Sequence, residues 1–377
     1  MIKNYFADFH VHIGRTKSGK PVKISGSKNL TLHSILEEAS LRKGLDLIGI
    51  IDCHVPEVLD ELEELIRRGE AEEQQGGGIR FQNTTLLLGT EMEVNDAAGQ
   101  GPFHVLGYFP TIERMRRWSQ WMAQHQKNIH LSSQRIYAPA KQLQKKLKEL
   151  QGIFIPAHIF TPFKSLYGKG VHLHLTEVLD PAYIDAVELG LSSDTQMANQ
   201  IPELLSYPYL TNSDAHSLSK IGREYQILAM AEPSFAAFVK VLREVEAHRI
   251  IANYGLHPKL GKYHHEVVER IQQISEGQQR SIAGVMEAEL NKRNRKPPYI
   301  HQIPLEYIPK LGKKSLDRLI QTFGSEMNVL HSASRHDLEQ VISKEVAEQI
   351  MEARQGNLVL ISGGKGKYGK VSYGSTL

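Results

Sequence analysis

The chain has 377 residues, of which 41% are hydrophobic and 23% are charged, and its formal net charge is +3. This balance is typical of a folded globular protein and excludes a disordered one, and the length predicts two or three domains. The single cysteine, Cys53, excludes an internal disulfide and a thiolate zinc cluster. No apolar run approaches the ~20 residues of a membrane span, and the N-terminus lacks a signal-peptide pattern, so we expect a cytoplasmic protein without a membrane partner.

The charge is distributed unevenly along the chain. Residues 256–377 hold 18 Lys+Arg and 13 Asp+Glu, a net +5, whereas the rest holds 27 and 29, a net −2. A basic C-terminal part favours a polyanionic partner, although an ordinary solvated surface would have the same composition.

Residues 1–255 alternate short apolar runs with amphipathic helical segments, which is the pattern of a parallel α/β fold. The predicted strands are residues 5–15, 45–52, 84–94, 103–109, 152–160, 183–190, 208–216 and 249–256. The predicted helices between them are residues 34–44, 58–73, 113–126, 139–152 and 234–249. About seven such repeats predict a barrel-like (β/α) domain.

Histidines and carboxylates recur where the predicted strands end. His10 and His12 are two residues apart in the first strand, so their side chains point to the same face. Later strands end with similar residues, namely Asp52 and His54, Glu91 and Glu93, His104, His158, and Asp214 and His216. In a β/α barrel these ends share one rim, where active sites lie.

Imidazoles and carboxylates gathered on one rim predict bound metal. An isolated pair of histidines could simply pack or cap, but unpaired buried charges are costly and metal binding usually compensates them. The number of candidate ligands exceeds the need of one zinc ion and fits two or three divalent ions (Zn, Mg or Mn). Such a cluster suits phosphoester hydrolysis, because it activates water and neutralises the phosphoryl oxygens and the leaving group.

The ordered motifs resemble those of the PHP (polymerase and histidinol phosphatase) superfamily. They are HxH at 10–12, DxH at 52–54, GxE at 89–91, HxLGY at 104–108, PAH at 156–158 and SDAH at 213–216. The resemblance covers residues 1–255 and implies a catalytic domain built as a distorted (β/α)7 PHP barrel with a trinuclear metal centre. The metal ligands implied motif by motif are His10, His12, His54, Glu91, His104, His158, Asp214 and His216. The family often has a further Asp ligand after the first HxH, but residues 13–28 contain no Asp or Glu, which puts that ligand in doubt.

A more specific resemblance, to the endonuclease Q family, extends over nearly the whole chain. It rests on the segments ELGLSSDTQMANQIPEL, TNSDAHSLSKIGREY, HPKLGKYH and KPPYIHQIPL. It implies a lesion-specific endodeoxyribonuclease that hydrolyses the phosphodiester 5′ to deaminated bases (uracil, hypoxanthine, xanthine) or abasic sites. Archaeal relatives carry a cysteine zinc finger after GKYH, whereas residues 256–300 contain no cysteine and are expected to form a helical connector.

Residues 301–377 resemble a helix-hairpin-helix DNA-binding domain. In its first hairpin, Leu311 and Gly312 form the predicted turn and Lys313 and Lys314 begin the next helix, where amides and positive charge can hold a DNA phosphate. In the second hairpin, Ser343 stands where glycine is usual. The alternative is a helical bundle that only caps the barrel, and the segment GGKGKYGK at 363–370 could be a phosphate-binding strap or a frayed terminus.

The sequence leaves three functions open. The first is the lesion-directed endonuclease acting on DNA that contains deaminated bases; the flipped base would enter a pocket. Its catalytic metal-holding residues would be His10, His12, Glu91, Asp214 and His216, and the candidate pocket walls are Phe160, Lys164, Tyr167, Ser192, Ser193 and Asp194. The second is a PHP-family phosphoesterase acting on a small phosphomonoester, which leaves the basic tail without a role. The third is a catalytically silent DNA-binding subunit, against which the nearly complete ligand set argues.

Overall fold

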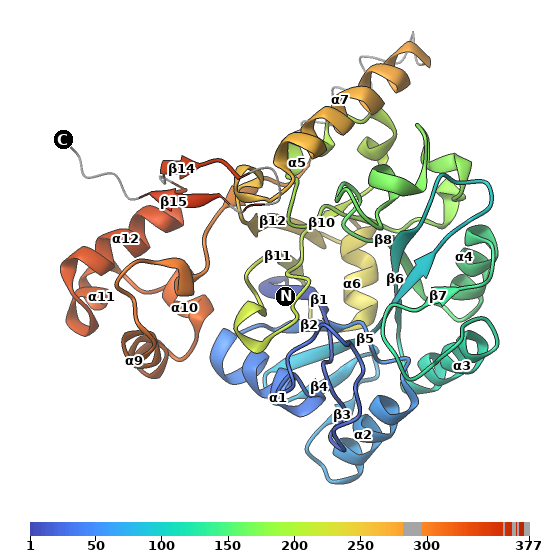
Figure 1. Ribbon diagram of the computed structural model, residues 1–377. Coiled ribbons are helices and arrows are strands. Elements are labelled where there is room, and N and C mark those ends of the chain that lie inside the picture. The colour runs from blue at the N-terminus through green and yellow to red at the C-terminus, as the bar shows by residue number, and fades with distance from the viewer. Residues whose placement is uncertain (282–295, 357–358, 364–366, 368, 373–377) are drawn as a thin grey trace.

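The computed structural model describes residues 1–281, 296–356, 359–363, 367 and 369–372 (Figure 1). The strands are β1 (Lys3–Val11), β2 (Leu47–Ile50), β3 (Glu72–Glu73), β4 (Ile79–Phe81), β5 (Thr84–Val94), β6 (Phe103–Phe109), β7 (Arg135–Ile136), β8 (Ile153–Pro156), β9 (Val187–Glu188), β10 (Tyr209–Leu210), β11 (Tyr225–Met230), β12 (Arg249–Gly255), β13 (Tyr299–His301), β14 (Val359–Ile361) and β15 (Lys370–Ser372). The α-helices are α1 (Leu32–Glu37), α2 (Pro56–Arg67), α3 (Ile112–Ala123), α4 (Ala140–Glu149), α5 (Thr195–Ala198), α6 (Phe235–Leu242), α7 (His264–Ser281), α9 (Lys313–Phe323), α10 (Glu326–His331), α11 (Arg335–Val341) and α12 (Lys344–Gln355). Shorter helical segments include η1 (Glu38–Lys43) and η7 (Pro258–Leu260).

In the described part of the chain, a ring of strands forms the centre of the larger unit (Figure 1). Its members are β1, β2, β5, β6, β8, β9 and β10. β1, β2 and β5 are parallel neighbours, and the antiparallel strand β6 joins β5 to β8. Backbone hydrogen bonds from Ile159 to Glu188 (2.9 Å) and from Ala215 to His10 (3.1 Å) link the β9–β10 pair to β8 and β1. The predicted α/β barrel is therefore confirmed, and the reversed strand β6 makes it a distorted one.

Several elements differ from the sequence prediction: strand β11 has no predicted counterpart, and the helix predicted over residues 234–249 ends at Leu242. The helix predicted over residues 58–73 ends at Arg67, since Gly69 takes a left-handed conformation (φ 72°) that stops the helix, and residues 72 and 73 form strand β3. The strand predicted over residues 249–256 is present as β12, but it pairs with β11 and β13 outside the ring.

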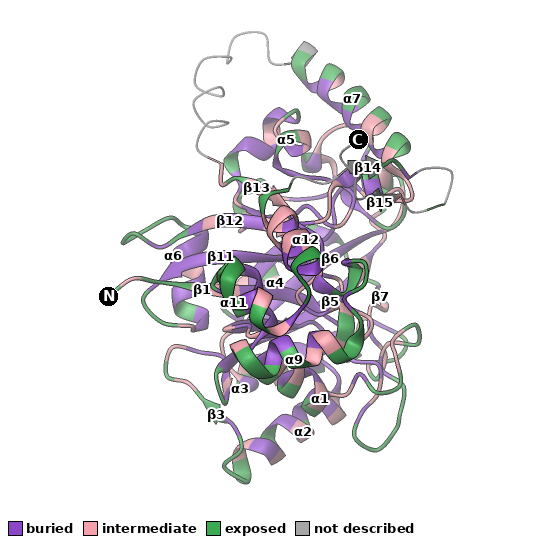
Figure 2. Ribbon diagram, turned by 90° about the vertical axis from the view of Figure 1, so that its left-hand side faces the viewer, coloured by how far each residue is buried: buried purple, intermediate pink, exposed green. Residues whose placement is uncertain are grey.

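The helices around the barrel bury one apolar face each, as the purple inner surfaces in Figure 2 show. Helix α2 buries Val58, Leu59 and Leu62 and leaves Asp60 and Glu63 exposed. This period of three to four residues is the pattern from which the helix was predicted. No helix within the described ranges combines the length and the apolar composition that a membrane crossing requires.

Helix α7 projects from the upper side of the barrel in Figure 1. Its apolar side chains Val267, Ile271 and Ile274 join the barrel core, and Arg270 Nε donates to the Tyr167 carbonyl oxygen at 2.7 Å. The predicted connector 256–300 therefore begins with a helix that packs on the barrel. Its residues 282–295 lie outside the described part of the chain.

Helices α9 to α12 form a separate unit with its own apolar core, drawn orange to red in Figure 1. Two ion pairs fix it to η1 of the barrel, Lys43 Nζ to Glu326 Oε2 (2.9 Å) and Arg42 to Asp317 (2.8 Å). The domain boundaries at residues 255 and 300 stay a prediction.

The glycine- and lysine-rich segment 363–370 follows strand β14. Within its described residues, the amide of Gly363 donates to Lys259 (2.7 Å) and that of Gly369 donates to Leu260 (3.0 Å), so these two glycines are tied to η7. Residues 364–366 and 368 of the predicted strap lie outside the described residues.

Candidate metal centre

The predicted ligand residues lie together at one end of the strand ring. They are His10 (β1), His12 (directly after β1), His54 (after β2), Glu91 (β5), His104 (β6), His158 (after β8), and Asp214 and His216 (after β10), and the carboxylate of Asp52 lies among them. All are buried except Asp214 and His216, which are partly exposed. Charged and imidazole side chains are rarely buried in such numbers unless they are paired or bind metal.

Three of these residues form what we term the aspartate group: His10, His12 and Asp214. The Nε2 atoms of His10 and His12 lie 3.4 and 3.5 Å from Asp214 Oδ1. His216 Nε2 lies 3.3 Å from the same oxygen. The spacing of these atoms leaves room for one cation between two imidazoles and a carboxylate.

A second set, the glutamate group, consists of Glu91, His104 and His158. His104 Nδ1 and His158 Nε2 lie 2.9 and 3.5 Å from Glu91 Oε1. Glu91 also faces the aspartate group, with Oε1 3.5 Å from His10 Nε2 and Oε2 3.6 Å from His12 Nε2. Glu91 therefore lies between the two groups and could serve an ion held by either.

Buried carboxylates behind the first β-strand orient its two histidines. His10 Nδ1 lies 2.9 Å from Glu188 Oε1, and His12 Nδ1 lies 3.1 Å from Asp52 Oδ2. Each contact directs the other ring nitrogen, Nε2, toward the groups described above. Carboxylates in this outer position are typical partners of metal-binding histidines.

Several buried imidazole nitrogen atoms of the centre have no hydrogen-bond partner, and this shows whether the centre suits metal ions. The Nε2 atoms of His10, His12, His54 and His104 are buried and have no hydrogen-bond partner. A buried polar atom without a partner costs free energy, and an imidazole nitrogen with a free lone pair is a ligand for zinc and other divalent ions. The residues present therefore fit divalent metal.

The ionisation of Glu91 and Asp214 also suits the binding of divalent metal ions. Burial raises the pKa of Glu91, but His104, Lys23 and His10 outweigh it and hold the pKa well below its usual value. Burial acts on Asp214 in the same way, and His10, His12 and His216 lower its pKa well below the usual value. Both carboxylates are thus ionised near neutral pH.

Two histidines of the centre are held neutral, the form that metal binding needs, whereas neighbouring carboxylates outweigh burial and raise the pKa of His158 and of His10. Burial lowers the pKa of His54 and of His104, although Asp52 and Glu91 respectively oppose the shift. A neutral imidazole offers the lone pair that a metal ion requires. His54 nevertheless belongs to neither three-residue group; its Nδ1 lies 3.1 Å from Thr90 Oγ1.

Strained backbone holds two of the ligands. His158 and Asp214 have positive φ values of 30° and 46°, which non-glycine residues rarely adopt, and such strain concentrates at functional sites. Gly190 (φ 73°) lies against His158, where an added Cβ would come within 2.5 Å of the His158 Cβ. Only glycine therefore allows the observed position of His158.

Sequence reasoning missed two charged residues of the centre, Glu188 and Lys23. Glu188 is a lone carboxylate in the apolar run YIDAVELG, and this polar break at a strand end was a signal that could have identified it. Lys23 lies in the loop between β1 and α1, where no periodicity indicates which side chain turns inward.

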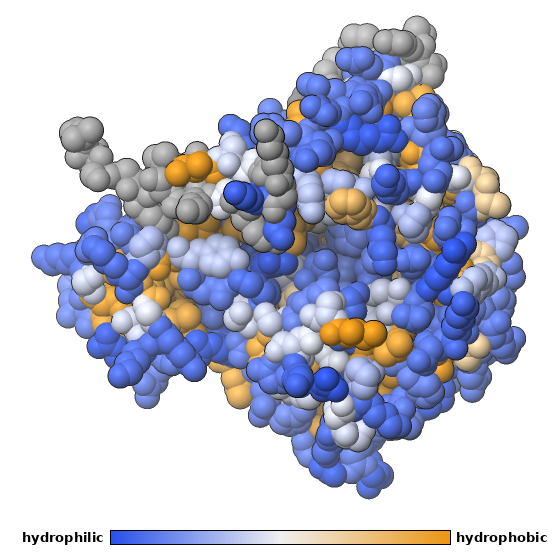
Figure 3. All heavy atoms as spheres, in the orientation of Figure 1, coloured by the Kyte–Doolittle hydropathy of each residue, from blue (hydrophilic) through white to orange (hydrophobic). Residues whose placement is uncertain are grey.

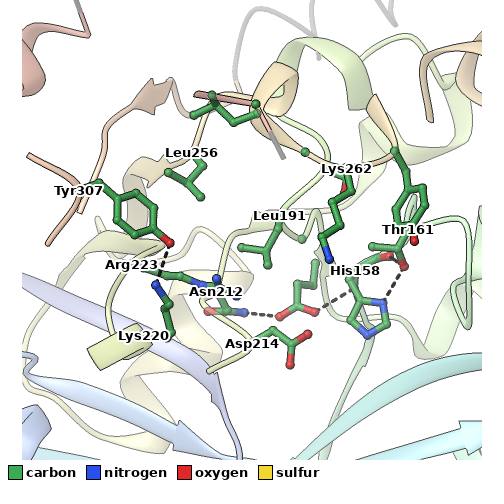
Figure 4. Close-up of a pocket in the computed structure, with 17 residues that line it drawn as sticks. His158, Thr161, Leu191, Asn212, Asp214, Lys220, Arg223, Leu256, Lys262 and Tyr307 are labelled. Atoms are coloured by element: carbon green, nitrogen blue, oxygen red, sulfur yellow. Dashed lines mark hydrogen bonds between the residues drawn. The ribbon is translucent and has the colours of Figure 1, made fainter. Parts of the chain in front are cut away.

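A cavity of about 710 Å³ opens beside the two groups. Figure 4 shows His158 and Asp214 on its floor, with Lys220, Arg223 and Lys262 around it. Its lining also includes Tyr307 and the apolar residues Leu191, Leu256 and Leu260. The face shown in Figure 3 carries a largely hydrophilic hollow near its middle. The cavity therefore combines positive charge, apolar surface and two candidate metal ligands.

The residues predicted as walls of a base pocket are distributed more widely. Ser192 lines the cavity. Ser193 Oγ donates to the Leu189 carbonyl oxygen (2.8 Å), and Asp194 caps α5 and pairs with His301 (3.1 Å).

Phe160, Lys164 and Tyr167 were also predicted to form walls of the base pocket, but none of them lines this cavity. Phe160 and Tyr167 are buried and stack on each other with ring centres 5.5 Å apart. Lys164 pairs with Glu93 (2.8 Å) at the edge of the centre. The cavity walls come mainly from later segments of the chain, including Lys220, Arg223 and Tyr307.

The predicted DNA-binding hairpin lies at the start of α9. Leu311 is buried in the C-terminal core, whereas Gly312, Lys313 and Lys314 are exposed. Gly312 is the N-cap residue and has no side chain to occupy the free amides of the first turn. At α12, by contrast, the Ser343 side chain accepts a hydrogen bond from the Val346 amide.

Known proteins share the sequence and the fold of this chain. A family profile described as PHP-associated matches residues 193–246. The Bacillus subtilis protein YqxK is 51% identical over 385 aligned residues, which cover 98% of this chain and 100% of YqxK. The lesion-specific endonuclease PfuEndoQ from Pyrococcus furiosus is 28% identical, with a TM-score of 0.82 over 99% of this chain and 96% of that one. Endonuclease Q in complex with a 27-mer duplex substrate with an abasic lesion at the active site is also 28% identical, with a TM-score of 0.80 over 99% and 97%.

Proposed function

Because the chain belongs to the endonuclease Q family of PHP-fold DNA repair nucleases, we propose that it nicks DNA on the 5′ side of damaged nucleotides. The damaged nucleotides are those with uracil, hypoxanthine or xanthine, and abasic sites. The products are a 3′-hydroxyl and a 5′-phosphate. The aspartate and glutamate groups would hold the divalent ions that this hydrolysis requires.

The position of the cavity carries the proposal. An enzyme that acts at a damaged nucleotide in a duplex must first turn that nucleotide out of the stack into a pocket. The cavity of about 710 Å³ lies within the usual size range of ligand sites and shares His158 and Asp214 with the two groups. A nucleotide in the cavity would therefore bring a flanking phosphate to the candidate metal centre, and the choice of the 5′ phosphate rests on the likeness to endonuclease Q.

The roles of the residues follow from this position. The bound ions would activate water and neutralise the phosphoryl oxygens and the leaving oxygen. The aspartate group would hold one ion and the glutamate group another, and Glu91 faces both groups. His216 stabilises the ionised Asp214, which it faces at 3.3 Å.

Cationic cavity residues would bind the DNA backbone next to the damaged nucleotide. Lys220 lies 4.5 Å above the Tyr307 ring and pairs with Glu306, so its amino group has a fixed position at the cavity edge. Arg223 Nε donates to the Ser213 carbonyl oxygen (2.9 Å), one residue before Asp214. Their positive charge favours a phosphate here and attracts no particular base.

A second DNA contact is proposed at the start of α9. Its exposed first-turn amides and the side chains of Lys313 and Lys314 would hold a phosphate of the duplex away from the lesion. This contact supplies affinity without reading the sequence.

The test compares cleavage of matched substrates by the full-length protein. Duplexes with a single deoxyuridine, deoxyinosine, deoxyxanthosine or abasic site are expected to be nicked 5′ to the lesion in the presence of Mg²⁺, Mn²⁺ or Zn²⁺. The undamaged duplex and p-nitrophenyl phosphate are expected to resist. Faster hydrolysis of the small phosphomonoester than of lesion DNA would favour the phosphatase instead, and no hydrolysis of either would favour a binding subunit.

A further inference from the structure

Three residues from the segments that carry the family resemblance meet beside the cavity, outside the candidate metal centre. Asp194 comes from ELGLSSDTQMANQIPEL, His257 from HPKLGKYH and His301 from KPPYIHQIPL. His301 Nε2 lies 3.1 Å from Asp194 Oδ2, and the ring centres of His257 and His301 lie 4.2 Å apart with an angle of 32° between the ring planes. We term these three residues the histidine brace. None of them belongs to the aspartate group or the glutamate group.

One side of the histidine brace contacts the first wall of the cavity, which residues 190–192 form. Asp194 follows this wall closely in the chain, and only 7% of the residue is exposed. Its Oδ1 accepts a hydrogen bond from the Met197 amide (2.9 Å), which leaves Oδ2 for His301. His301 therefore fixes the point at which the first wall ends.

The other side of the histidine brace contacts the second wall of the cavity, which is formed within the segment 256–263. The His257 carbonyl oxygen accepts a hydrogen bond from the Leu260 amide (2.8 Å), so the turn that brings Leu260 to the cavity starts at His257. A Cβ added to Gly261 would lie 3.7 Å from Ser192 Oγ, so the second wall approaches the first closely at this point. A shift of His257 would therefore change the contact between the walls.

The charges of the histidine brace suit these contacts. Burial raises the pKa of Asp194, but hydrogen bonds from His301 and from the Met197 amide outweigh it and hold the pKa below its usual value. Burial, together with the neighbouring His301, lowers the pKa of His257 to about 4. Asp194 is thus ionised and His257 is neutral near neutral pH, so His301 meets a negative charge on one side and an uncharged ring on the other.

We propose that His301 is a positioning residue that holds both walls of the cavity in place. His301 lies on β13 and does not line the cavity, so it acts through Asp194 and His257. Walls held in this way would keep a flipped nucleotide in the orientation that cleavage requires. The inference rests on the proposed function only for this consequence, because the contacts with the two walls do not depend on the substrate.

Loss of the His301 imidazole should leave the fold intact. Strand β13 keeps its backbone pairing with β12, and Thr195 Oγ1 donates to the Pro297 carbonyl oxygen at 3.4 Å. These contacts hold the segment around residue 300 near α5 without the imidazole. His301→Ala therefore tests the position of the walls and not the stability of the whole protein.

The first measurement is hydrogen exchange of the full-length protein without DNA, followed by mass spectrometry. In His301→Ala, peptides that cover residues 190–194 and 256–263 should exchange about 10-fold faster than in wild type, as expected from the loss of one charge-assisted hydrogen bond. His301→Gln keeps a donor for Asp194 but has no ring for His257. In this variant only the second wall should exchange faster.

The matched control is His336→Ala, because His336 is exposed on α11 in the C-terminal unit. Both walls should exchange in this variant as they do in wild type. Unchanged exchange of either wall in His301→Ala would overturn the inference. If His301→Ala failed to fold, His301→Gln and His257→Ala would decide, and wild-type exchange of the second wall in both of them would overturn it equally.

DNA binding is measured on the same preparations, with a deoxyuridine duplex and the matched intact duplex. His301→Ala should bind the deoxyuridine duplex about 10-fold more weakly and the intact duplex as wild type does, with an unchanged metal content. Faster exchange of both walls with an unchanged preference for deoxyuridine would refute the consequence for the nucleotide.

The two measurements separate the inference from the proposed function. Wild type that cuts no lesion DNA would overturn the function, whereas hydrogen exchange would still decide the role of His301. Wild type that nicks lesion DNA, combined with unchanged walls in His301→Ala, would leave the function standing and contradict the inference.

Discussion

The start of α9 provides a quantitative prediction about DNA affinity. Lys313 and Lys314 are exposed, and among the described residues no ion pair involves either of them. If each neutralises one phosphate, the double change Lys313→Glu and Lys314→Glu removes two contacts. The slope of log K against log salt then becomes less steep by ~1.8, and binding at ~0.1 M salt weakens ~60-fold, or by about 2.5 kcal/mol.

The assay is a salt titration of DNA affinity, by fluorescence anisotropy, on matched damaged and intact duplexes. Both duplexes should lose affinity by the same factor, because a phosphate contact does not read the base. Lys344→Glu is the control, since Lys344 begins a helix whose first amides are already capped by Ser343. The preference for uracil over thymine should persist among the residual cuts.

An unchanged slope in the double mutant would refute this role of α9. The same salt titration can be carried out on a protein that lacks residues 301–377, in which the whole C-terminal unit is removed. If truncation also left affinity and slope unchanged, the C-terminal unit would be a structural cap, and the DNA contact would have to lie on the barrel or on α7.

Three further predictions concern stability and metal binding. Burial raises the pKa of Glu224 to about 8, so the folded protein keeps a proton that the unfolded chain releases near its ordinary value of 4.5. The free energy of unfolding should therefore fall as the pH rises between these values, by up to ~4–5 kcal/mol, and Glu224→Gln should remove this loss in melting curves recorded from pH 4.5 to 9. Gly190→Ala should push His158 away and lower metal affinity on the order of 10-fold or more, as measured by chelator competition; unchanged affinity would contradict the packing argument. Chelation should lower the melting temperature and added Zn²⁺ should restore it, because the carboxylates of the centre repel one another without cations; an indifferent melting temperature would contradict the metal assignment.

Much of the metal centre could be predicted because strand ends meet at one rim. His10 and Glu91 lie on long strands, where alternation determines which face a side chain occupies, and His12 follows directly after the first of them. Asp214 could be predicted for a related reason, since it follows a short apolar run. These positions depend on local periodicity and on the barrel topology, and both leave a pattern in the sequence.

The cavity and the loop residues could not be predicted in the same way. The cavity brings together His158, Lys220, Lys262 and Tyr307 from segments far apart in the chain, so no local spacing reveals it. Lys23 turns inward from an irregular loop, which has no periodicity. Phe160 and Tyr167 were predicted to line a base pocket, but they stack on each other in the buried core. Aromatic residues that follow a candidate metal ligand in the sequence can therefore belong to the core and not to a binding site.

The most direct test of the central claim maps the cut in a duplex with one deoxyuridine and repeats the measurement with Asp214→Asn. Wild type should nick the damaged strand 5′ to the uracil, leave a 3′-hydroxyl and a 5′-phosphate, and spare the intact duplex. Asp214→Asn should lose cleavage by on the order of 100-fold or more while its DNA affinity stays near that of wild type, because Asp214 is not one of the cationic groups proposed to contact the DNA backbone. A cut on the 3′ side, equal cutting of undamaged DNA, or near-wild-type cleavage by the variant would contradict the account.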